Sequence, residues 1–210
     1  MSEADRRKWD ARYRGGSYAD RAHPSALLAE WEPRLPRGRA LDVACGAGRN
    51  SLFLASTGRQ VDAVDISAEG LERARQAASG GGLRIRWQRA DLEADGDAAL
   101  PAGPYDLVVL VRYVNRALWP GLLERLAPGG VLLCEQHVDS MEDVVGPRSA
   151  AFRMRPGELL RAATEEPPFG LRVLHYDEGT VTDPDGRTAA LARLVLRRSA
   201  PGERTIGPDE

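Results

Sequence analysis

The sequence predicts an α/β fold in which a doubly wound, mostly parallel sheet ends in an antiparallel hairpin. Residues 39–65 read as strand, glycine-rich turn, helix and strand, which together make one βαβ unit. Residues 105–111 form a continuous apolar run, as expected for a central parallel strand that is buried on both faces. Two strand-like runs near the C-terminus, 171–176 and 189–196, are separated by a turn-rich segment, which indicates a terminal hairpin.

A short helix is predicted at the N-terminus. Residues 3–14 are largely charged, and Trp9 and Tyr13 are spaced so that both rings fall on one helical face. Two interpretations stay open: the helix docks its rings on the core, or it closes as a lid over a ligand. Gly15 and Gly16 follow the helix and provide a hinge for such a lid.

A second short helix, residues 24–32, is predicted to stop at Pro33 and Pro36. The polar C-terminus, with its prolines and glycine, has the composition of a disordered tail. The predicted divisions are residues 1–36 for an N-terminal helical lid, 37–198 for the main domain and 199–210 for the tail.

Glycines interrupt the first βαβ unit between its strand and its helix. Without a Cβ at Gly46 and Gly48, the backbone can turn tightly and lie close against a ligand. Asp65 ends the second strand, 23 positions after Asp42. A ribose-binding acid typically lies about 20 residues beyond such a turn in a nucleotide-binding unit. A tight turn without any ligand is the alternative.

The middle of the chain continues the alternation of helices and strands. Ser67 is a suitable N-cap for a helix that ends at glycines 80–82. Residues 83–87 alternate like a strand and lead to Asp91. The following elements are predicted as a helix at 116–126, a turn at 128–130 and a strand at 131–137.

Composition excludes several classes of function. The chain has 210 residues and a formal net charge of −2, so no basic excess favours nucleic acid or anionic membranes. No apolar run approaches the ~18 residues of a membrane span, and the N-terminus has no signal-peptide pattern. Cys45 and Cys134 lie far apart in strand-like runs and are expected to be reduced, buried packing residues. We therefore expect a cytoplasmic protein.

The glycine-rich turn lacks the third glycine of the dinucleotide pattern, and no P-loop follows it. Instead, residues 42–48, DVACGAG, resemble motif I of the class I S-adenosylmethionine-dependent methyltransferases. Residues 126–132, LAPGGVL, resemble the turn into the fifth strand of that family, and residues 46–55, GAGRNSLFLA, look closest to its tellurite-resistance-like branch. The family usually has glycine at the position of Ala44, and alanine is tolerable there only if its φ stays below zero.

The resemblance implies a Rossmann-like methyltransferase fold, methyl-transfer activity and S-adenosylmethionine as the cofactor. It implies that Asp65 accepts hydrogen bonds from the ribose hydroxyls and Asp91 from the adenine amino group, although a turn cap explains Asp91 nearly as well. Residues 9–13, WDARY, match a lid element that such enzymes often carry. No metal is expected. The residues expected to bind the cofactor are Trp9, Tyr13, Asp42, Ala44, Gly46, Gly48, Asn50, Asp65, Ile66, Asp91, Leu92 and Val111.

Candidate catalytic residues follow the carboxyl ends of the fourth and fifth strands, where ligands lie in open α/β sheets. His137 is the best base candidate by type and place, and a polar strand cap is the alternative. Tyr113 is expected to shape the cleft with His137. Arg112, together with arginines 153 and 155, can hold an anionic acceptor, unless these are simply solvated arginines. The histidines at 23 and 175 are expected away from the cleft.

The expected function is methyl transfer to a small molecule, such as a thiol, a chalcogen oxyanion or another small nucleophile. Residues 111–115 do not resemble the Asn-Pro-Pro-Tyr run of nucleobase amino methyltransferases, and no extra domain for RNA or protein recognition is evident. We expect no nucleic-acid or membrane partner, and a monomer or homodimer. The alternatives are an NAD(P)-dependent reductase and a non-catalytic S-adenosylmethionine-binding module.

Overall fold

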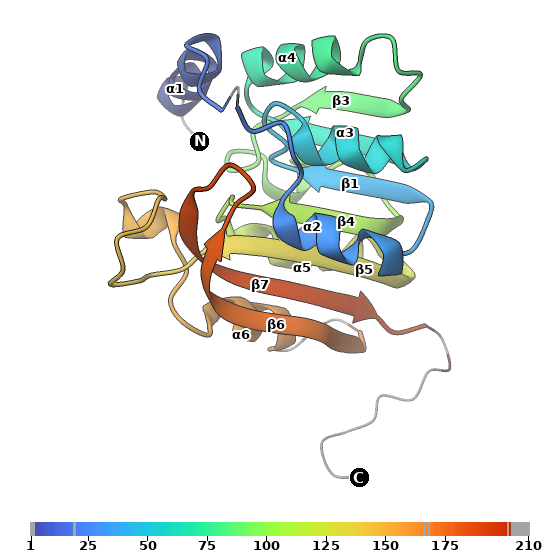
Figure 1. The fold of residues 1–210 in the computed structure, drawn as a ribbon. Coiled ribbons are helices and arrows are strands. Elements are labelled where there is room, and N and C mark those ends of the chain that lie inside the picture. The colour runs from blue at the N-terminus through green and yellow to red at the C-terminus, as the bar shows by residue number, and fades with distance from the viewer. Residues whose placement is uncertain (1–2, 19, 166, 168, 201, 203–210) are drawn as a thin grey trace.

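In the computed structural model, the strands form one seven-stranded sheet in the order β3-β2-β1-β4-β5-β7-β6 (Figure 1). The structure describes residues 3–18, 20–165, 167, 169–200 and 202, so most of the expected C-terminal tail lies outside the described residues. The strands are β1 (Arg39–Val43), β2 (Gln60–Asp65), β3 (Ile85–Arg89), β4 (Tyr105–Val111), β5 (Leu126–His137), β6 (Leu171–Thr182) and β7 (Thr188–Arg198). The helices are α1 (Glu3–Arg14), α2 (Ala26–Trp31), α3 (Arg49–Ser56), α4 (Ala68–Ala78), α5 (Trp119–Glu124) and α6 (Glu158–Thr164).

The sheet is parallel through its first five strands and antiparallel at one edge. Strand β1 pairs in parallel with β2 and β4, and β4 pairs in parallel with β5. Strand β7 runs antiparallel between β5 and β6, which confirms the terminal hairpin. The predicted fold class is therefore confirmed, with hairpin strands longer than expected.

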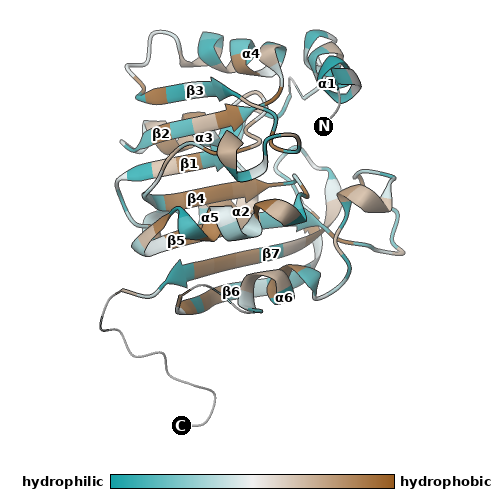
Figure 2. Cartoon of the chain, turned by 180° about the vertical axis from the view of Figure 1, so that it is seen from behind, coloured by the Kyte–Doolittle hydropathy of each residue, from teal (hydrophilic) through white to brown (hydrophobic). Residues whose placement is uncertain are grey.

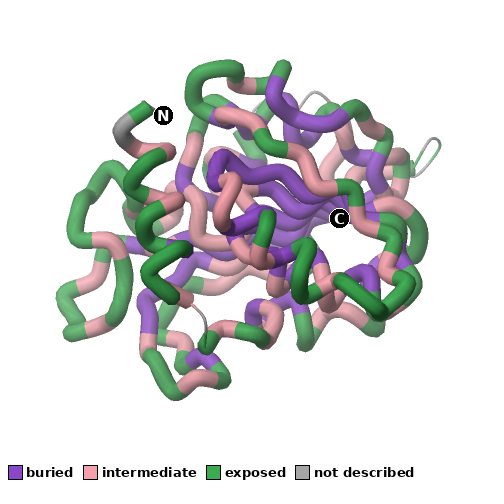
Figure 3. Tube along the Cα trace, turned by 90° about the horizontal axis from the view of Figure 1, so that it is seen from above, coloured by how far each residue is buried: buried purple, intermediate pink, exposed green. Residues whose placement is uncertain are grey.

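Two apolar layers pack on opposite faces of the sheet. One contains Leu27 of α2 and Leu54 of α3, and the other contains Leu122 of α5 and Leu159 of α6, all fully buried. The central strands carry the hydrophobic residues (Figure 2), and they lie in the buried middle of the molecule (Figure 3). Helix α2 is thus part of the core, whereas α1 lies beside α4 at the sheet edge.

The chain between β4 and β5 differs from the prediction. The expected helix at 116–126 is a 3₁₀ turn, Arg116–Leu118, followed by the short α5. Strand β5 already begins at Leu126, and its pairing with β4 jumps from Leu126 to Val131. The expected turn at 128–130 is therefore an irregularity inside the strand, because proline has no N–H to donate to the ladder. In the N-terminal half, residues 32–34 similarly form a 3₁₀ turn that contains Pro33.

Two smaller expectations are confirmed. The Ser67 side chain accepts a hydrogen bond from the Gly70 N–H at 3.0 Å and caps α4. Both cysteines are buried and unbridged. Among the described residues, no helix is both long and apolar enough to cross a bilayer, and no group of side chains is arranged to hold a metal ion.

Candidate functional site

The glycine-rich turn between β1 and α3 is built from left-handed backbone. Ala44 has φ +55°, Gly46 +58° and Gly48 +80°. The expectation that Ala44 keeps a negative φ is therefore wrong. The turn needs this backbone because it is closed by two main-chain hydrogen bonds, from Cys45 N to Val64 O (3.0 Å) and from Gly48 N to Cys45 O (2.9 Å). An L-residue in this region carries strain of about 1–2 kcal/mol.

The two glycines of the turn face different surroundings. A Cβ on Gly46 would lie 2.3 Å from the hydroxyl oxygen of Tyr13, so the α1 ring lies directly on the turn. A Cβ on Gly48 would lie 2.7 Å from the Trp87 ring. The α1 side of Gly46 is therefore covered by the Tyr13 ring, while Gly48 permits close packing of the turn against β3 rather than approach of a ligand.

Asp65, at the carboxyl end of β2, connects this turn to α4. Its carboxylate oxygens accept from the Gly46 N–H and the Ser67 N–H, each at 2.8 Å. Burial raises the pKa of Asp65, and these backbone N–H groups oppose that shift. A carboxylate offers about four acceptor positions, so the side chain is held in place and retains capacity to accept from a further hydroxyl group.

Two other predicted cofactor residues lie beneath the turn. Asp42 accepts from the Ser51 hydroxyl at 2.5 Å, and burial raises the pKa of its carboxyl to about 7. Asn50 accepts from the Ser25 N–H at 2.9 Å and is buried. Both contacts fix the turn and α3 against their neighbours.

A cavity of about 370 Å³ opens at the carboxyl ends of β2 and β3. Ile66, Ala90 and Asp91 line its floor, and Glu3 and Arg6 of α1 line its other side. The carboxylate of Asp91 accepts from the N–H groups of residues 93 and 94, at 3.0 and 3.1 Å, which is the turn cap considered above. Leu92 is fully buried below the cavity.

Polar contacts hold helix α1 against the N-terminus of α4, next to this cavity. The carboxylate of Asp10 accepts from the Ser67 hydroxyl at 2.7 Å and from the Glu69 N–H at 3.3 Å, at the N-terminus of α4. The rings of Trp9 and Tyr13 lie with centroids 6.3 Å apart, so they share one helical face as predicted. Tyr13 is buried, which places it between α1 and the turn.

Arg112 follows β4 directly and does not face an open cleft. Its guanidinium donates through Nε to Glu135 at 2.9 Å and forms two hydrogen bonds to Asp183, at 2.6 and 2.7 Å. All three side chains are buried. The arginines expected to converge on an acceptor therefore do not converge: Arg112 is neutralised by two carboxylates, and Arg155 is exposed.

His137 lies at the carboxyl end of β5 and is half-buried. Burial, with a contribution from nearby Arg112 and Arg153, lowers the pKa of its imidazole to about 4, so the ring is neutral at pH 7. Tyr113 lies on the other side of β4, where burial raises the pKa of its phenol and the carboxylates of Asp91 and Asp65 contribute. Val111 ends β4 between these two groups. The structure thus places Tyr113 toward the cavity and His137 toward the arginines.

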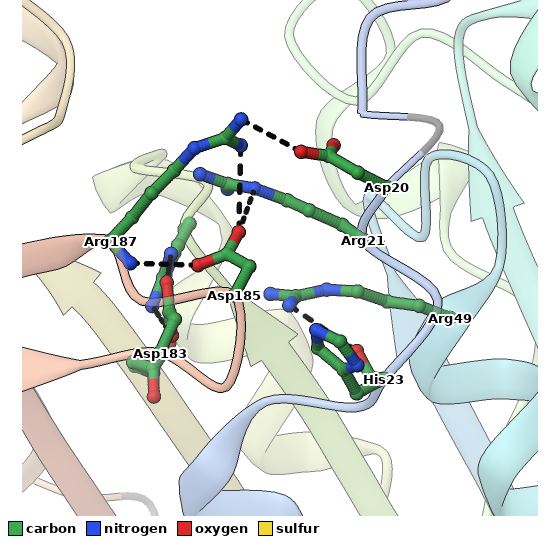
Figure 4. A network of polar contacts seen from close by, with 9 residues as sticks. Asp20, Arg21, His23, Arg49, Asp183, Asp185 and Arg187 are labelled. Atoms are coloured by element: carbon green, nitrogen blue, oxygen red, sulfur yellow. Dashed lines mark hydrogen bonds and ion pairs between the residues drawn. The ribbon is translucent and has the colours of Figure 1, made fainter.

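A charged cluster that the sequence reasoning missed surrounds the arginine–carboxylate contact. Asp185 and Arg187, in the turn between β6 and β7, meet Arg21 from the segment before α2 and Arg49 from the start of α3 (Figure 4). His23, expected away from the cleft, contributes its carbonyl oxygen to Arg49 at 3.5 Å. The sequence contained one indication of this cluster. A cation in the first turn of a helix interacts unfavourably with the helix dipole, so Arg49 at the start of α3 suggests a role other than helix stabilisation.

Comparison with known proteins agrees with this geometry. Residues 40–130 match a family model described as a methyltransferase domain. The chain is 33% identical over 125 residues to the ribosomal protein L11 methyltransferase of Thermus thermophilus, covering 59% of this chain and 48% of that protein. It is 32% identical over 111 residues to the tRNA 5-carboxymethoxyuridine methyltransferase of Escherichia coli K12, covering 50% and 42%. The chain thus spans about half, or less, of the curated relatives it matches.

A solved S-adenosylmethionine-dependent methyltransferase of Methanosarcina mazei has the same fold, with a TM-score of 0.63 and 15% identity over 85% of this chain and 99% of that one. The fold and the matched domain support a class I S-adenosylmethionine-dependent methyltransferase, and they indicate S-adenosylmethionine as the cofactor. The residues fit this group: Asp65 ends β2, Asp91 lies two residues beyond β3, and Ile66 and Ala90 line the cavity beside them.

Proposed function

We propose that the protein transfers a methyl group from S-adenosylmethionine to a small-molecule acceptor. The observation that carries this proposal is the oriented carboxylate of Asp65 beside the glycine-rich turn, next to the cavity at Asp91. In this arrangement Asp65 holds the ribose and Asp91 the adenine, with Ile66 supplying an apolar wall. Helix α1 covers the site with Tyr13 as a lid over residues 46 and 70.

The residues of the chain act mainly by position. Bound S-adenosylmethionine supplies an electrophilic methyl group on a sulfonium, and transfer of that group is an in-line displacement. Positioning therefore supplies much of the rate. Tyr113 and His137 flank the end of β4, where the acceptor approaches, and α1 excludes water from the site.

The acceptor is a small soft nucleophile, such as a thiol or a chalcogen oxyanion. This part of the proposal rests on the resemblance of residues 46–55 to the tellurite-resistance-like branch and on the low pKa of His137. A histidine with a pKa of about 4 is a weak base at neutral pH. It suits an acceptor that has already lost its proton, which a thiolate or an oxyanion has and a phenol has not.

A methyl-transfer screen tests the proposal. Thiols, selenium and tellurium oxyanions, phenols and amines are offered with radiolabelled S-adenosylmethionine to the wild type and to His137→Ala. We expect label on a thiol or chalcogen compound, with a loss in His137→Ala well below the ~10²–10⁴-fold typical of a general base. Activity confined to phenols or amines contradicts the soft-nucleophile assignment. Activity only on ribosomal protein or tRNA, the substrates named for the two relatives, contradicts the small-molecule assignment.

Two further outcomes separate the competing functions. Binding of S-adenosylhomocysteine without methylation of any acceptor indicates a binding module, and stabilisation by NADPH but not by S-adenosylhomocysteine indicates a reductase. We also propose a cytoplasmic location, because both cysteines are unbridged. A monomer or homodimer remains our prediction for the assembly.

A further inference from the structure

Four arginines lie together on the side of the site where we propose that the acceptor binds. They come from the segment before α2, the start of α3, the end of β4 and the β6–β7 turn. We call Arg21, Arg49, Arg112 and Arg187 the arginine cluster. Figure 4 shows Arg21 and Arg49 extending side by side toward the turn that carries Asp183 and Asp185. The cluster lies beyond the carboxyl ends of β1 and β4 and beside the start of β7, away from the cavity at Asp91.

Three members of the cluster have carboxylate partners. Arg112 is paired with Asp183 and with Glu135, Arg21 Nε lies 3.3 Å from an oxygen of Asp185, and Arg187 reaches Asp20 at 2.8 Å. These contacts neutralise their guanidinium groups locally. The fourth arginine of the cluster has no such ion pair with a described residue.

Arg49 is that arginine. Among the residues that the structure describes, it has no carboxylate within ion-pair distance, and its one hydrogen bond is a long contact of 3.5 Å to the carbonyl oxygen of His23. Burial lowers the pKa of its guanidinium and the neighbouring charge of Arg112 adds to this shift, whereas Glu135 and Asp183, which are already paired with Arg112, oppose it. A half-buried cation that makes no ion pair of its own carries a desolvation cost, which the negative charge of a ligand would offset.

Two further polar atoms beside Arg49 are also without hydrogen bonds. Nε2 of His23 and Nε of Arg21 are both buried, and neither makes a hydrogen bond to another described residue, although Nε of Arg21 lies within ion-pair distance of Asp185 at 3.3 Å. His23 and Arg21 both act on the carboxyl of Asp185, so they lie around the same turn. The guanidinium of Arg49 and these two nitrogen atoms can each offer an N–H to a carboxylate or an oxyanion.

We infer that Arg49, with Arg21 and His23, binds an anionic group on the methyl acceptor. This inference rests on the proposed function and deepens it, because it assigns the acceptor a negative charge. Arg49 supplies the charge and two donors in a fork, while Asp185 positions Arg21 and the buried carboxylates of Glu135 and Asp183 hold Arg112. Neutral acceptors of similar size bind poorly at this site.

The test measures anion binding directly, without methyl transfer. Sodium acetate, phosphate and selenite are titrated at constant ionic strength into the full chain, with and without S-adenosylhomocysteine, and followed by calorimetry. We expect saturable binding of at least one anion to the wild type and to the control Arg172→Gln, whose arginine is exposed on β6. Arg49→Gln lowers the affinity about 10-fold or more, the loss expected for a charge-assisted hydrogen bond. Acetate alone points to an organic carboxylate, and selenite or phosphate to an oxyanion.

Two results overturn the inference. One is equal anion binding by the wild type and Arg49→Gln, or no saturable binding by the wild type. The other is that Arg49→Gln weakens S-adenosylhomocysteine but not 5′-methylthioadenosine, which lacks the amino-acid part, because Arg49 then holds the carboxylate of the cofactor. If Arg49→Gln does not fold, two other variants replace it. Arg49→Lys keeps the charge without the forked guanidinium, and Arg21→Gln removes the neighbouring cation. Both variants must then bind the anion more weakly than the wild type. Anion binding that survives while every acceptor fails in the methylation screen refutes the proposed function and not this site.

Discussion

Arg112 and Asp183, 71 positions apart in the chain, form a two-bonded ion pair at 2.6 and 2.7 Å. Arg112 has a left-handed backbone, with φ +58°, directly after β4, and its guanidinium reaches Asp183 in the β6–β7 turn. Glu135 of β5 accepts a third hydrogen bond from the same guanidinium. Together these contacts link the end of β4, strand β5 and the β6–β7 turn.

Replacing Arg112 tests the structural role of this contact. Arg112→Met leaves the carboxylates of Glu135 and Asp183 buried without a cation, which typically costs about 3–5 kcal/mol of the free energy of unfolding. Urea unfolding at pH 7 measures the loss. Arg187→Met is the matched control, because its ion pair with Asp20 is exposed and is expected to contribute about 1 kcal/mol or less. Equal losses in the two variants contradict the role assigned to Arg112.

The left-handed Ala44 predicts a stabilising substitution. Ala44→Gly removes strain of about 1–2 kcal/mol, and the greater freedom of glycine in the unfolded chain offsets roughly half of it. We expect a net gain of about 0.5–1 kcal/mol in urea unfolding. Ala47→Gly in the same turn is the control, since Ala47 is not left-handed and should lose stability. A loss in Ala44→Gly shows that its methyl group contributes packing that outweighs the strain.

His137 predicts a pH dependence of stability. Its pKa is about 4 in the folded chain, mainly because of burial, against about 6.5 in the unfolded chain. The unfolded state therefore binds more protons between these values, and the stabilising contribution present above pH 6.5 is lost as the pH falls toward 4. His137→Gln should lose less stability than the wild type between pH 7 and pH 4.5, as measured by urea unfolding. Parallel losses contradict a depressed pKa.

Helix α1 is expected to act on cofactor binding more than on folding. Tyr13 lies on the turn at Gly46, but none of the α1 side chains that the structure describes belongs to either apolar core layer. Deleting residues 1–18 should therefore leave a cooperatively folding core, seen by circular dichroism and thermal unfolding. The same variant should bind S-adenosylhomocysteine more weakly. A deletion that melts the whole protein shows instead that α1 is a structural helix.

The sequence predicted the parts of this structure that depend on local pattern. The βαβ unit, the buried strand at 105–111 and the hairpin follow from residue periodicity and turn residues. The left-handed φ of Ala44 could not be read in this way, because it is imposed by hydrogen bonds that close the turn onto Val64. The pairing of Arg112 with Asp183 could not be predicted either, because local residue spacing carries no information about contacts between residues 71 positions apart.

Arg49 is a residue whose unusual position could have been recognised from the sequence but was not used in the prediction. It follows the last glycine of the turn and begins α3, a position that disfavours a cation. The sequence alone could not show that its neighbours are other arginines, because these come from the segment before α2, from β4 and from the β6–β7 turn. The tertiary fold is needed to see that Arg49 forms no ion pair with a described residue.

Calorimetry of S-adenosylhomocysteine binding to the wild type, Asp65→Ala and Asp62→Ala tests the central claim most directly. Both acids lie on β2 and are buried, but Asp62 is paired with Arg39, Arg86 and Tyr105 at the other end of the strand. The account predicts binding to the wild type and to Asp62→Ala, and a weakening of about 1.5–3 kcal/mol in Asp65→Ala, the value of hydrogen bonds to a charged group. Unchanged affinity in Asp65→Ala, or binding of NADPH in place of S-adenosylhomocysteine, contradicts it.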